Sequence, residues 1–554
     1  MDGAARRLGI LPDHIGYRGD AVQPPAETIE AIKQAMAGDR AHRISIAPAE
    51  GGTLKCAAAP DHAWGWAVQI YAVRSRDSWG IGDFADLRQL GRWAASNGAE
   101  AILVSPLGAQ PPTPHQEPCP YYSSSRRFLN LLYLRVEEIP GAEKARDELR
   151  PLRDEALALN AQRHIDHDAV FRLKSQALEI IHRAEPEPKG MAGWIAEQGK
   201  ALRDFAGFTA ISETHGPAWR DWPPGLQHPG SVDVDEVRGR LAGRVRFHEW
   251  VQFHLQKQLA RAAAEINLIA DVPVGFASDG FDAWRWQHLV APGVRVGAPP
   301  DFFFPDGQDW GMPAFDPWKL ADAHFEPFVE AIRSVARHAG GMRLDHVMGL
   351  FRLFWIPAGM TAAGGAYVRY PSSALLEILA LESSRTGSFV IGEDLGLVEP
   401  AVRSAMRRRR MLGFRLMWFE DKPPEEWDRE SVAAIGTHDL PTVAGIWNLT
   451  EPDERHHHLR RRLVDATHLP DGAHPVDVAV AAYAKLATAR SRIVLASLED
   501  ALGVEERINV PGTTTEFPNW RLALPFTLED IERSSGPAGI AEVMGTAGRS
   551  RRKK

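Results

Sequence analysis

The sequence is poor in cysteine, in long apolar runs and in positive charge. Its 554 residues include two cysteines, Cys56 and Cys119, which excludes a disulfide-rich scaffold and favours two free thiols. No apolar run approaches the roughly 18 residues that a membrane span needs, and the N-terminal residues lack the apolar core of a secretion signal. Acids outnumber bases by 72 to 64, which disfavours nucleic acid as the main partner. These absences predict a cytoplasmic protein with no nucleic acid and no membrane among its partners.

Motifs of several common enzyme classes are also missing. The chain has no GxSxG element, no phosphate-binding P-loop and no HExxH pair, and a lone glycine-rich stretch at 359–367 opens no convincing βαβ unit. Hydrophobic residues make up 44% and charged residues 25%, as in ordinary globular proteins. Tryptophan is unusually frequent, with 17 residues against 8 tyrosines. Most of these rings should pack in the core, but some could form flat apolar surfaces for a ligand.

Eight short apolar runs recur along the chain. Each has the length and the β-branched or aromatic content of a strand, and most are almost continuously apolar, as buried parallel strands are. The runs cover residues 66–73, 99–107, 266–274, 341–347, 388–396, 413–420, 432–439 and 507–513.

Helical patterns lie between several of these runs. After the first run, Asp83 can cap a helix in which Phe84, Leu87 and Leu90 share one face, before Gly98 ends it. Alternating strands and helices predict the α/β class and, with eight strands, a (β/α)8 TIM barrel with large, mainly helical insertions on its catalytic face.

The lengths between the runs suggest how the chain is divided. We expect an N-terminal helical segment at 1–60, with its helix over AETIEAIKQAM, and a catalytic barrel at 61–530. A helical subdomain at 108–250 and a functional loop rich in Pro, Gly, Trp and Phe at 275–325 would interrupt this barrel. The remaining residues, 531–554, should form a flexible basic tail.

Three of the runs end in an acid within a polar cluster, where a barrel places its catalytic groups. Arg343 and Asp345 fall on the same face of one strand, so the cation can hold the carboxylate charged and oriented. Glu393, from the next strand, could serve as general acid/base with a raised pKa. Asp439, beside His438, could form hydrogen bonds with sugar hydroxyls. Two carboxylates with separate roles are what glycoside transfer requires.

Other roles are compatible with the same residues. Acids and histidines at strand ends also serve as helix caps and structural ion pairs. A metal site could draw on Asp345, His346, Glu393, His438 and Asp439, although no spaced pair such as HxH supports it.

Nine sequence motifs occur in order between about residues 70 and 530. Together they resemble the 4-α-glucanotransferases of the amylomaltase (disproportionating enzyme) family, glycoside hydrolase family 77, which are relatives of the α-amylases. The motifs are SWGIGDFADL (78–87), SPL (105–107), PYYSSSRRFLN (120–130), DVPVGFASDGFDAW (271–284), GAPPDFFFPDGQDWGMPAFD (297–316), MRLDHVMGLFRLFWIP (342–357), IGEDLG (391–396), GTHDLPT (436–442) and NVPGTTTEFPNWR (509–521).

The resemblance implies a role for each matching residue. Asp345 falls on the family's nucleophile, Glu393 on its acid/base and Asp439 on its transition-state stabiliser. In the loop around Trp310, the tryptophan and its neighbours are implied to lie over the acceptor subsites. The implied substrate-binding residues are Arg343, His438, Tyr121, Asp301, Gln308, Trp310 and Asn509.

Two positions depart from the family pattern. Met312 stands where the family usually has Asn, and Tyr122 replaces the Ser that follows Pro-Tyr. Both are implied to border the substrate groove, so they bear on chain-length preference more than on the chemistry.

The implied activity moves an α-1,4-glucan segment from a donor to the 4-hydroxyl of glucose or another glucan. Its partners would be maltooligosaccharides, longer α-1,4-glucans and glucose as acceptor, with no organic cofactor and no metal. An amylase-type hydrolase with the same carboxylates is the main alternative, and a non-catalytic glucan-binding protein is another. The sequence does not predict an oligomeric state.

Overall fold

Eight parallel strands form the centre of the protein. The computed structural model describes residues 3–17, 19–36, 54–301, 304–451, 453–513 and 516–550. Each central strand pairs with its neighbours in chain order, and the last strand returns to the first. A bridge between Ile391 and Leu412 closes the remaining gap. The fold is therefore the expected (β/α)8 TIM barrel. Its strands are β3 (Ala63–Val68), β4 (Ala101–Val104), β7 (Asn267–Val272), β10 (Gly341–Leu344), β13 (Phe389–Gly392), β14 (Gly413–Leu416), β15 (Ser431–Ala434) and β16 (Ile493–Ser497).

Seven of the eight apolar runs overlap these strands, and the prediction for the eighth is wrong. Residues 507–513 form no strand, and the barrel is closed instead by β16, over the sequence IVLAS. Pro511 and Gly512 interrupt the 507–513 run, and its Asn509 turns back toward residue 438 through a backbone hydrogen bond. The true strand follows an alanine-rich helix closely, so its apolar residues merge with that helix in the sequence pattern.

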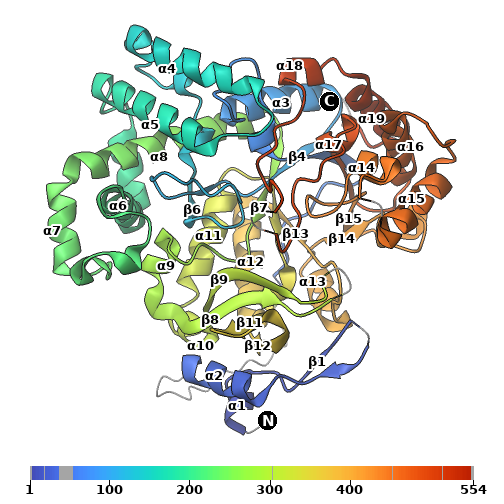
Figure 1. Cartoon of the computed structure of the whole chain (residues 1–554), viewed down its shortest axis with the longest axis horizontal. Coiled ribbons are helices and arrows are strands. Elements are labelled where there is room, and N and C mark those ends of the chain that lie inside the picture. Colours follow the sequence, from blue (N-terminus) through green and yellow to red (C-terminus); the bar gives the residue numbers. More distant parts are fainter. Residues whose placement is uncertain are drawn as a thin grey trace.

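Helices cover the outside of the barrel (Figure 1). The helix expected after Asp83 is α3, and the Asp83 carboxylate accepts bonds from the N–H groups of Ala85 and Asp86 in a capping box. Strands β14 and β15 are joined by the short 3₁₀ turn Pro424–Glu426. The helices that connect barrel strands are α3 (Phe84–Ser96), α8 (Ala242–Ala263), α11 (Glu326–Ala336), α12 (Ser372–Thr386), α13 (Pro400–Arg408) and α16 (Pro475–Ala487).

The long segment between β4 and β7 forms a helical lobe, seen to the left of the barrel in Figure 1. It starts with the hairpin of β5 (Gly108–Ala109) and β6 (Ser125–Leu129). Helix α8 packs against both α3 and α6, so it belongs to the lobe and to the barrel's outer ring. The other helices of the lobe are α4 (Arg146–Ala158), α5 (His167–Ala184), α6 (Met191–His215) and α7 (Val232–Arg240).

A four-stranded antiparallel sheet is the main feature that the sequence did not predict. Its strands are β8 (Val290–Ala298), β9 (Gln308–Phe315), β11 (Arg352–Pro357) and β12 (Ala366–Arg369), in the order β12-β11-β8-β9. The expected long loop at 275–325 is therefore a β-hairpin flanked by α9 (Phe281–Arg285) and α10 (Pro317–Asp322).

The N-terminal segment lies against this sheet (Figure 1). Its predicted helix is α2 (Ala26–Met36), which packs on β8 and β11. It also contains α1 (Gly3–Arg7) and a small hairpin of β1 (His14–Ile15) and β2 (Ala21–Val22). Residues 37–53 of the expected segment lie outside the described residues.

Residues 531–550 are not a frayed tail. They contain the end of α18 (Leu528–Ile531) and α19 (Ser535–Thr546), which packs against α16 and buries Ile540 and Met544. Arg549 is fully buried and donates hydrogen bonds to the carbonyls of Ala63, Ala487 and Ser491. The prediction counted glycines and charges and missed the apolar spacing within SGPAGIAEVMGT. Residues 551–554 lie outside the described residues.

No helix within the described ranges combines the length and the apolar character that crossing a membrane requires.

Candidate active site

Asp345 and Glu393 leave the carboxyl ends of two neighbouring barrel strands. Leu344, the last residue of β10, pairs with Gly392, the last residue of β13, and each acid is the next residue. The Glu393 N–H donates to the Leu344 carbonyl at 3.0 Å, so the two strands stay in register up to the acids. The two predicted carboxylates are thus brought side by side.

Arg343 lies between two carboxylates below this pair. Its guanidinium is buried and donates to Asp271 Oδ2 at 2.5 Å, while Nη2 lies 3.0 Å from Asp345 Oδ1. The Tyr121 hydroxyl donates to the same Asp271 oxygen at 2.6 Å. Burial lowers the pKa of Arg343, but the nearby Asp271 and the other anionic groups more than offset it, so the pKa is raised well above its usual value. Arg343 is therefore a fixed cation that orients Asp345.

The environment of Glu393 favours its protonated form. Burial raises the pKa of Glu393 to about 7, although Arg343 opposes the shift, and Asp345 adds to it. The carboxyl group also accepts hydrogen bonds from the N–H of Leu395 at 2.7 Å and the N–H of His346 at 3.0 Å. Such a group can give and take a proton near neutral pH.

Asp439 follows β15, two strands beyond β13 around the barrel, and is held by residues that follow β16. Asn509 Nδ2 donates to Asp439 Oδ1 at 2.6 Å, and His438 Nε2 lies 3.4 Å from Oδ2. The Arg507 guanidinium donates to the Asp439 carbonyl at 2.8 Å. Residues 507–513, which do not form the expected strand, therefore orient this third acid.

Three aromatic rings meet beside these acids. The Tyr121 ring lies 5.0 Å from His438 and 5.5 Å from Trp520, and His438 lies 5.1 Å from Trp520, measured between centroids. Tyr121 and His438 line a pocket inside the mouth of the barrel together with Asp271 and Arg343. The pocket thus has one aromatic wall and one charged wall.

Trp310 approaches the site from the antiparallel sheet. It lies on β9, and its ring meets the edge of His346 at 5.4 Å between centroids. Trp310 Nε1 donates to Gln308 Oε1 at 3.2 Å. Asp301 follows β8 at the other side of the hairpin, where its carboxylate accepts a bond from the Phe304 N–H at 2.7 Å. Gln308 and Trp310 are therefore together, and His346, which contacts Trp310, also donates its N–H to Glu393.

The two unusual residues, Tyr122 and Met312, both contact the segment after β7. The Tyr122 hydroxyl lies 3.2 Å from Ser278 Oγ, and Met312 is buried against Gly275. They join the Trp310 hairpin to the barrel.

Three residues of this site are absent from the sequence predictions for substrate binding. Asp271 lies inside the third apolar run, just before Val-Pro. His346 and Trp520 have positive φ angles of 43° and 60°, which non-glycine residues rarely adopt and which often occur at functional sites. A search for acids within every run would have found Asp271, whereas backbone strain cannot be read from a sequence.

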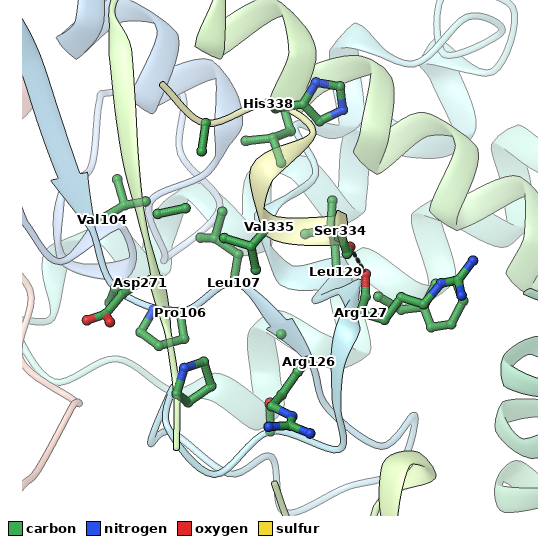
Figure 2. Close-up of a pocket in the computed structure, with 18 of the residues that line it drawn as sticks. Val104, Pro106, Leu107, Arg126, Arg127, Leu129, Asp271, Ser334, Val335 and His338 are labelled. Carbon is green, nitrogen blue, oxygen red and sulfur yellow. Dashed lines mark hydrogen bonds between the residues drawn. The ribbon is translucent and has the colours of Figure 1, made fainter. Parts of the chain in front are cut away.

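A second cavity lies behind β4 and β7, next to α8 and α11. Its lining is mainly apolar and includes Val104, Leu107 and Val335. Figure 2 shows Asp271 at the edge of this cavity, with its carboxylate turned away from Leu107 and Val335. The charged groups of Asp271 and Arg343 therefore serve the pocket at the barrel mouth.

Among the described residues, no group of three His, Cys, Asp or Glu side chains is arranged to hold a metal ion.

Comparisons with known proteins show the family of the chain. The family model described as 4-α-glucanotransferase matches residues 68–528. A 4-α-glucanotransferase of Mycobacterium bovis is 40% identical over 88% of this chain and 75% of its own length. One of Haemophilus influenzae is 30% identical over 84% of this chain and 76% of its own length.

Solved structures show the same fold. The amylomaltase of Corynebacterium glutamicum superposes with a TM-score of 0.83 at 25% identity, over 98% of this chain and 99% of that chain. An amylomaltase of Streptococcus agalactiae, solved in complex with acarbose, gives a TM-score of 0.74 at 20% identity, over 88% of this chain and all of that chain.

An α/β barrel with acids at the carboxyl ends of its strands is an architecture that can serve enzymes acting on glycosidic bonds. The chain belongs to the 4-α-glucanotransferase family and is a glycosyltransferase that acts on α-glucans.

Proposed function

We propose that this enzyme moves an α-1,4-glucan segment from a donor to the 4-hydroxyl of glucose or another glucan by a retaining double displacement. The observation that carries the proposal is the pair Asp345–Glu393, one acid fixed by Arg343 and the other with a pKa of about 7. These environments suit a nucleophile and a general acid/base.

In the first step, an oxygen of Asp345 attacks C1 of a glucose unit of the donor. The bond from C1 to the glycosidic oxygen breaks, and Glu393 gives its proton to that oxygen. The reducing-end fragment departs, and the rest of the donor stays bound to Asp345 as a β-linked ester. Asp439, oriented by Asn509, would stabilise the positive charge that develops on the sugar ring.

In the second step, Glu393 takes the proton from the 4-hydroxyl of the acceptor. The acceptor oxygen attacks C1, the ester bond to Asp345 breaks, and an α-1,4 bond forms. Each carboxyl group returns to its starting protonation state, so the cycle is balanced without a cofactor.

The remaining predicted residues have binding roles in this proposal. Arg343 and His438 would hold the reacting glucose, and Tyr121 would stack beside it. Trp310, Gln308 and Asp301 would form the acceptor side on the β8–β9 hairpin. An acceptor bound there can compete with water because its effective concentration is high.

Incubation with pure maltotriose tests the proposal. We expect glucose and a series of longer maltooligosaccharides, with a constant number of reducing ends. A rising number of reducing ends with only shorter products would identify a hydrolase instead, and unchanged maltotriose would contradict catalysis on this substrate.

A further inference from the structure

Two polar residues occupy matching positions at the ends of the first two barrel strands. Val68, the last residue of β3, pairs with Val104, the last residue of β4, so the next residues, Gln69 and Ser105, stand at the same height. Gln69 keeps an extended backbone, with φ −88° and ψ 101°, so the strand geometry continues through it. Both residues line the pocket at the barrel mouth.

The next two strands, β7 and β10, carry charged residues at the same height in the barrel. Val104 pairs with Ala270, which places Ser105 beside Asp271, and Asp271 pairs directly with Arg343. Because side chains alternate along a strand, these residues all point to the inside of the barrel. We call Gln69, Ser105, Asp271 and Arg343 the polar row.

Three members of the polar row have buried oxygen atoms without a hydrogen-bond partner among the described residues. They are Gln69 Oε1, Ser105 Oγ and Asp271 Oδ1, in residues that are only 8%, 4% and 5% exposed. An unpaired buried polar atom costs the folded state free energy, and native proteins retain few of them. Three in one row, facing one pocket, indicate that the pocket is built for a ligand with several hydroxyl groups.

The distance of the polar row below the catalytic carboxylates fits the size of a sugar ring. Arg343 lies two residues before Asp345 on β10, which corresponds to about 6.6 Å along the strand. Glu393 is level with Asp345, so the row lies below both catalytic carboxylates. A glucose unit whose C1 faces Asp345 therefore directs its more distant hydroxyl groups toward the row.

We propose that Gln69 and Ser105 are binding residues for the glucose unit that becomes attached to Asp345, and that they pair with its hydroxyl groups from beneath. The inference rests on the proposed function and extends it to two residues of β3 and β4. The sugar hydroxyls would satisfy oxygens that are unpaired in the free enzyme, so the free energy lost on folding is recovered on binding. Gln69 and Ser105 thereby contribute to selection of a fully hydroxylated donor sugar.

Two substitutions of similar size test this inference: Gln69→Met and Ser105→Ala. Each removes the hydrogen-bonding group and leaves most of the packing. We expect each variant to lower kcat/KM for maltotriose by about 3- to 10-fold, the usual worth of one neutral hydrogen bond. Because an unpaired buried oxygen is lost, the melting temperature of the free variants should stay the same or rise.

Ser388→Ala is the matched control. Ser388 is fully buried before β13, and its hydroxyl donates to the Ala339 carbonyl at 2.5 Å. Its loss should lower the melting temperature and leave kcat/KM unchanged. If Gln69→Met and Ser105→Ala behave like this control, or if their kcat/KM equals that of the wild type, the polar row does not bind the donor sugar.

The test also separates this inference from the proposed function. A wild-type protein that leaves maltotriose unchanged would contradict the function, and calorimetric titration with acarbose would then test the polar row. Weaker acarbose binding by Gln69→Met and Ser105→Ala than by Ser388→Ala would support the row, and equal binding would contradict it.

Discussion

Asp345 and Glu393 stand at the same height on adjacent parallel strands, each one residue beyond the paired residues Leu344 and Gly392. Neighbouring strands lie about 4.8 Å apart. The backbones of the two acids are therefore neighbours. The proposed retaining mechanism expects their carboxyl groups to lie roughly 5–5.5 Å apart, whereas an inverting mechanism would need roughly 6.5–9.5 Å.

Replacement of the proposed nucleophile should abolish turnover and preserve the fold. Asp345→Asn keeps the side-chain size but loses the attacking oxygen, so we expect kcat on maltotriose to fall by roughly 10³-fold or more. The melting temperature should stay within a few degrees of the wild type. Asp61→Asn, which alters an exposed acid paired with Arg429, is the control and should retain full activity. Substantial turnover by Asp345→Asn would refute the assignment.

Activity should fall on the alkaline side of neutrality. Glu393 must be protonated to act as an acid, and its pKa is about 7, so kcat/KM should drop about tenfold per pH unit above that value. Glu393→Gln should be inactive on maltotriose. An alkaline limb displaced to pH 9 or above would contradict the role of Glu393 as the acid.

The same pKa predicts how stability depends on pH. The folded-state pKa of Glu393, about 7, lies above the usual value of 4.5, so the folded chain binds this proton more tightly than the unfolded chain does. Its stabilising effect is present at low pH and is lost as the pH rises through 7. Glu393→Gln cannot ionise, so its melting temperature relative to the wild type should be higher at pH 8 than at pH 5. An identical difference at both pH values would contradict the raised pKa.

The orientation of Asp439 should depend on the amide of Asn509. Asn509→Asp places a second carboxylate where Nδ2 donates to Asp439 at 2.6 Å, so repulsion should displace Asp439 and lower kcat/KM at least about tenfold. Asn509→Ala removes the hydrogen bond without adding charge and should be less impaired. Equal kinetics in the two variants and the wild type would show that Asn509 does not orient Asp439.

Trp310 should control the balance between transfer and hydrolysis. Trp310→Ala removes the ring that contacts His346, which weakens acceptor binding and allows water to compete. We expect reducing ends to accumulate from maltotriose several times faster, relative to transfer, than in the wild type. Trp310→Phe keeps an aromatic ring and should retain most transfer. A ratio unaffected by Trp310→Ala would remove this residue from the acceptor side.

The SWGIGDFADL motif (78–87) should contribute to the stability of the folded protein. Within it, Asp83 and Asp86 are buried and pair with Arg135, and Lys174 lies 3.8 Å from Asp83. Lys174→Met would leave the two acids with a single cation, at a cost of about 3–5 kcal/mol of unfolding free energy. Denaturant unfolding measures this loss. Lys33→Met, which breaks an exposed pair, should change the free energy by less than about 1 kcal/mol.

The barrel and its acids could be predicted because their signals are local. A buried parallel strand is continuously apolar, and Asp345, Glu393 and Asp439 each follow such a run. The antiparallel sheet gave no comparable signal, because β8 and β9 contain proline and glycine and are only partly buried. Their pairing depends on contacts with β11 and α2, which lie far away in the sequence.

The sequence predicted the three acids of the site better than it predicted the contacts of the residues around them. Motif matching identified Asn509, but its bond to Asp439 requires residues 507–513 to turn back toward the barrel. Gln69 and Ser105 look ordinary in the sequence, because only strand register reveals that they are level with Asp271 and Arg343.

The pairing of β3 with β16 also has a consequence for biosynthesis. Strand β3 is the first barrel strand to leave the ribosome, and β16 is the last. One edge of β3 therefore stays without its partner while most of the chain is translated, and an uncovered strand edge is a template for aggregation. Nascent chains of this enzyme should depend on chaperones until β16 emerges and the ring closes.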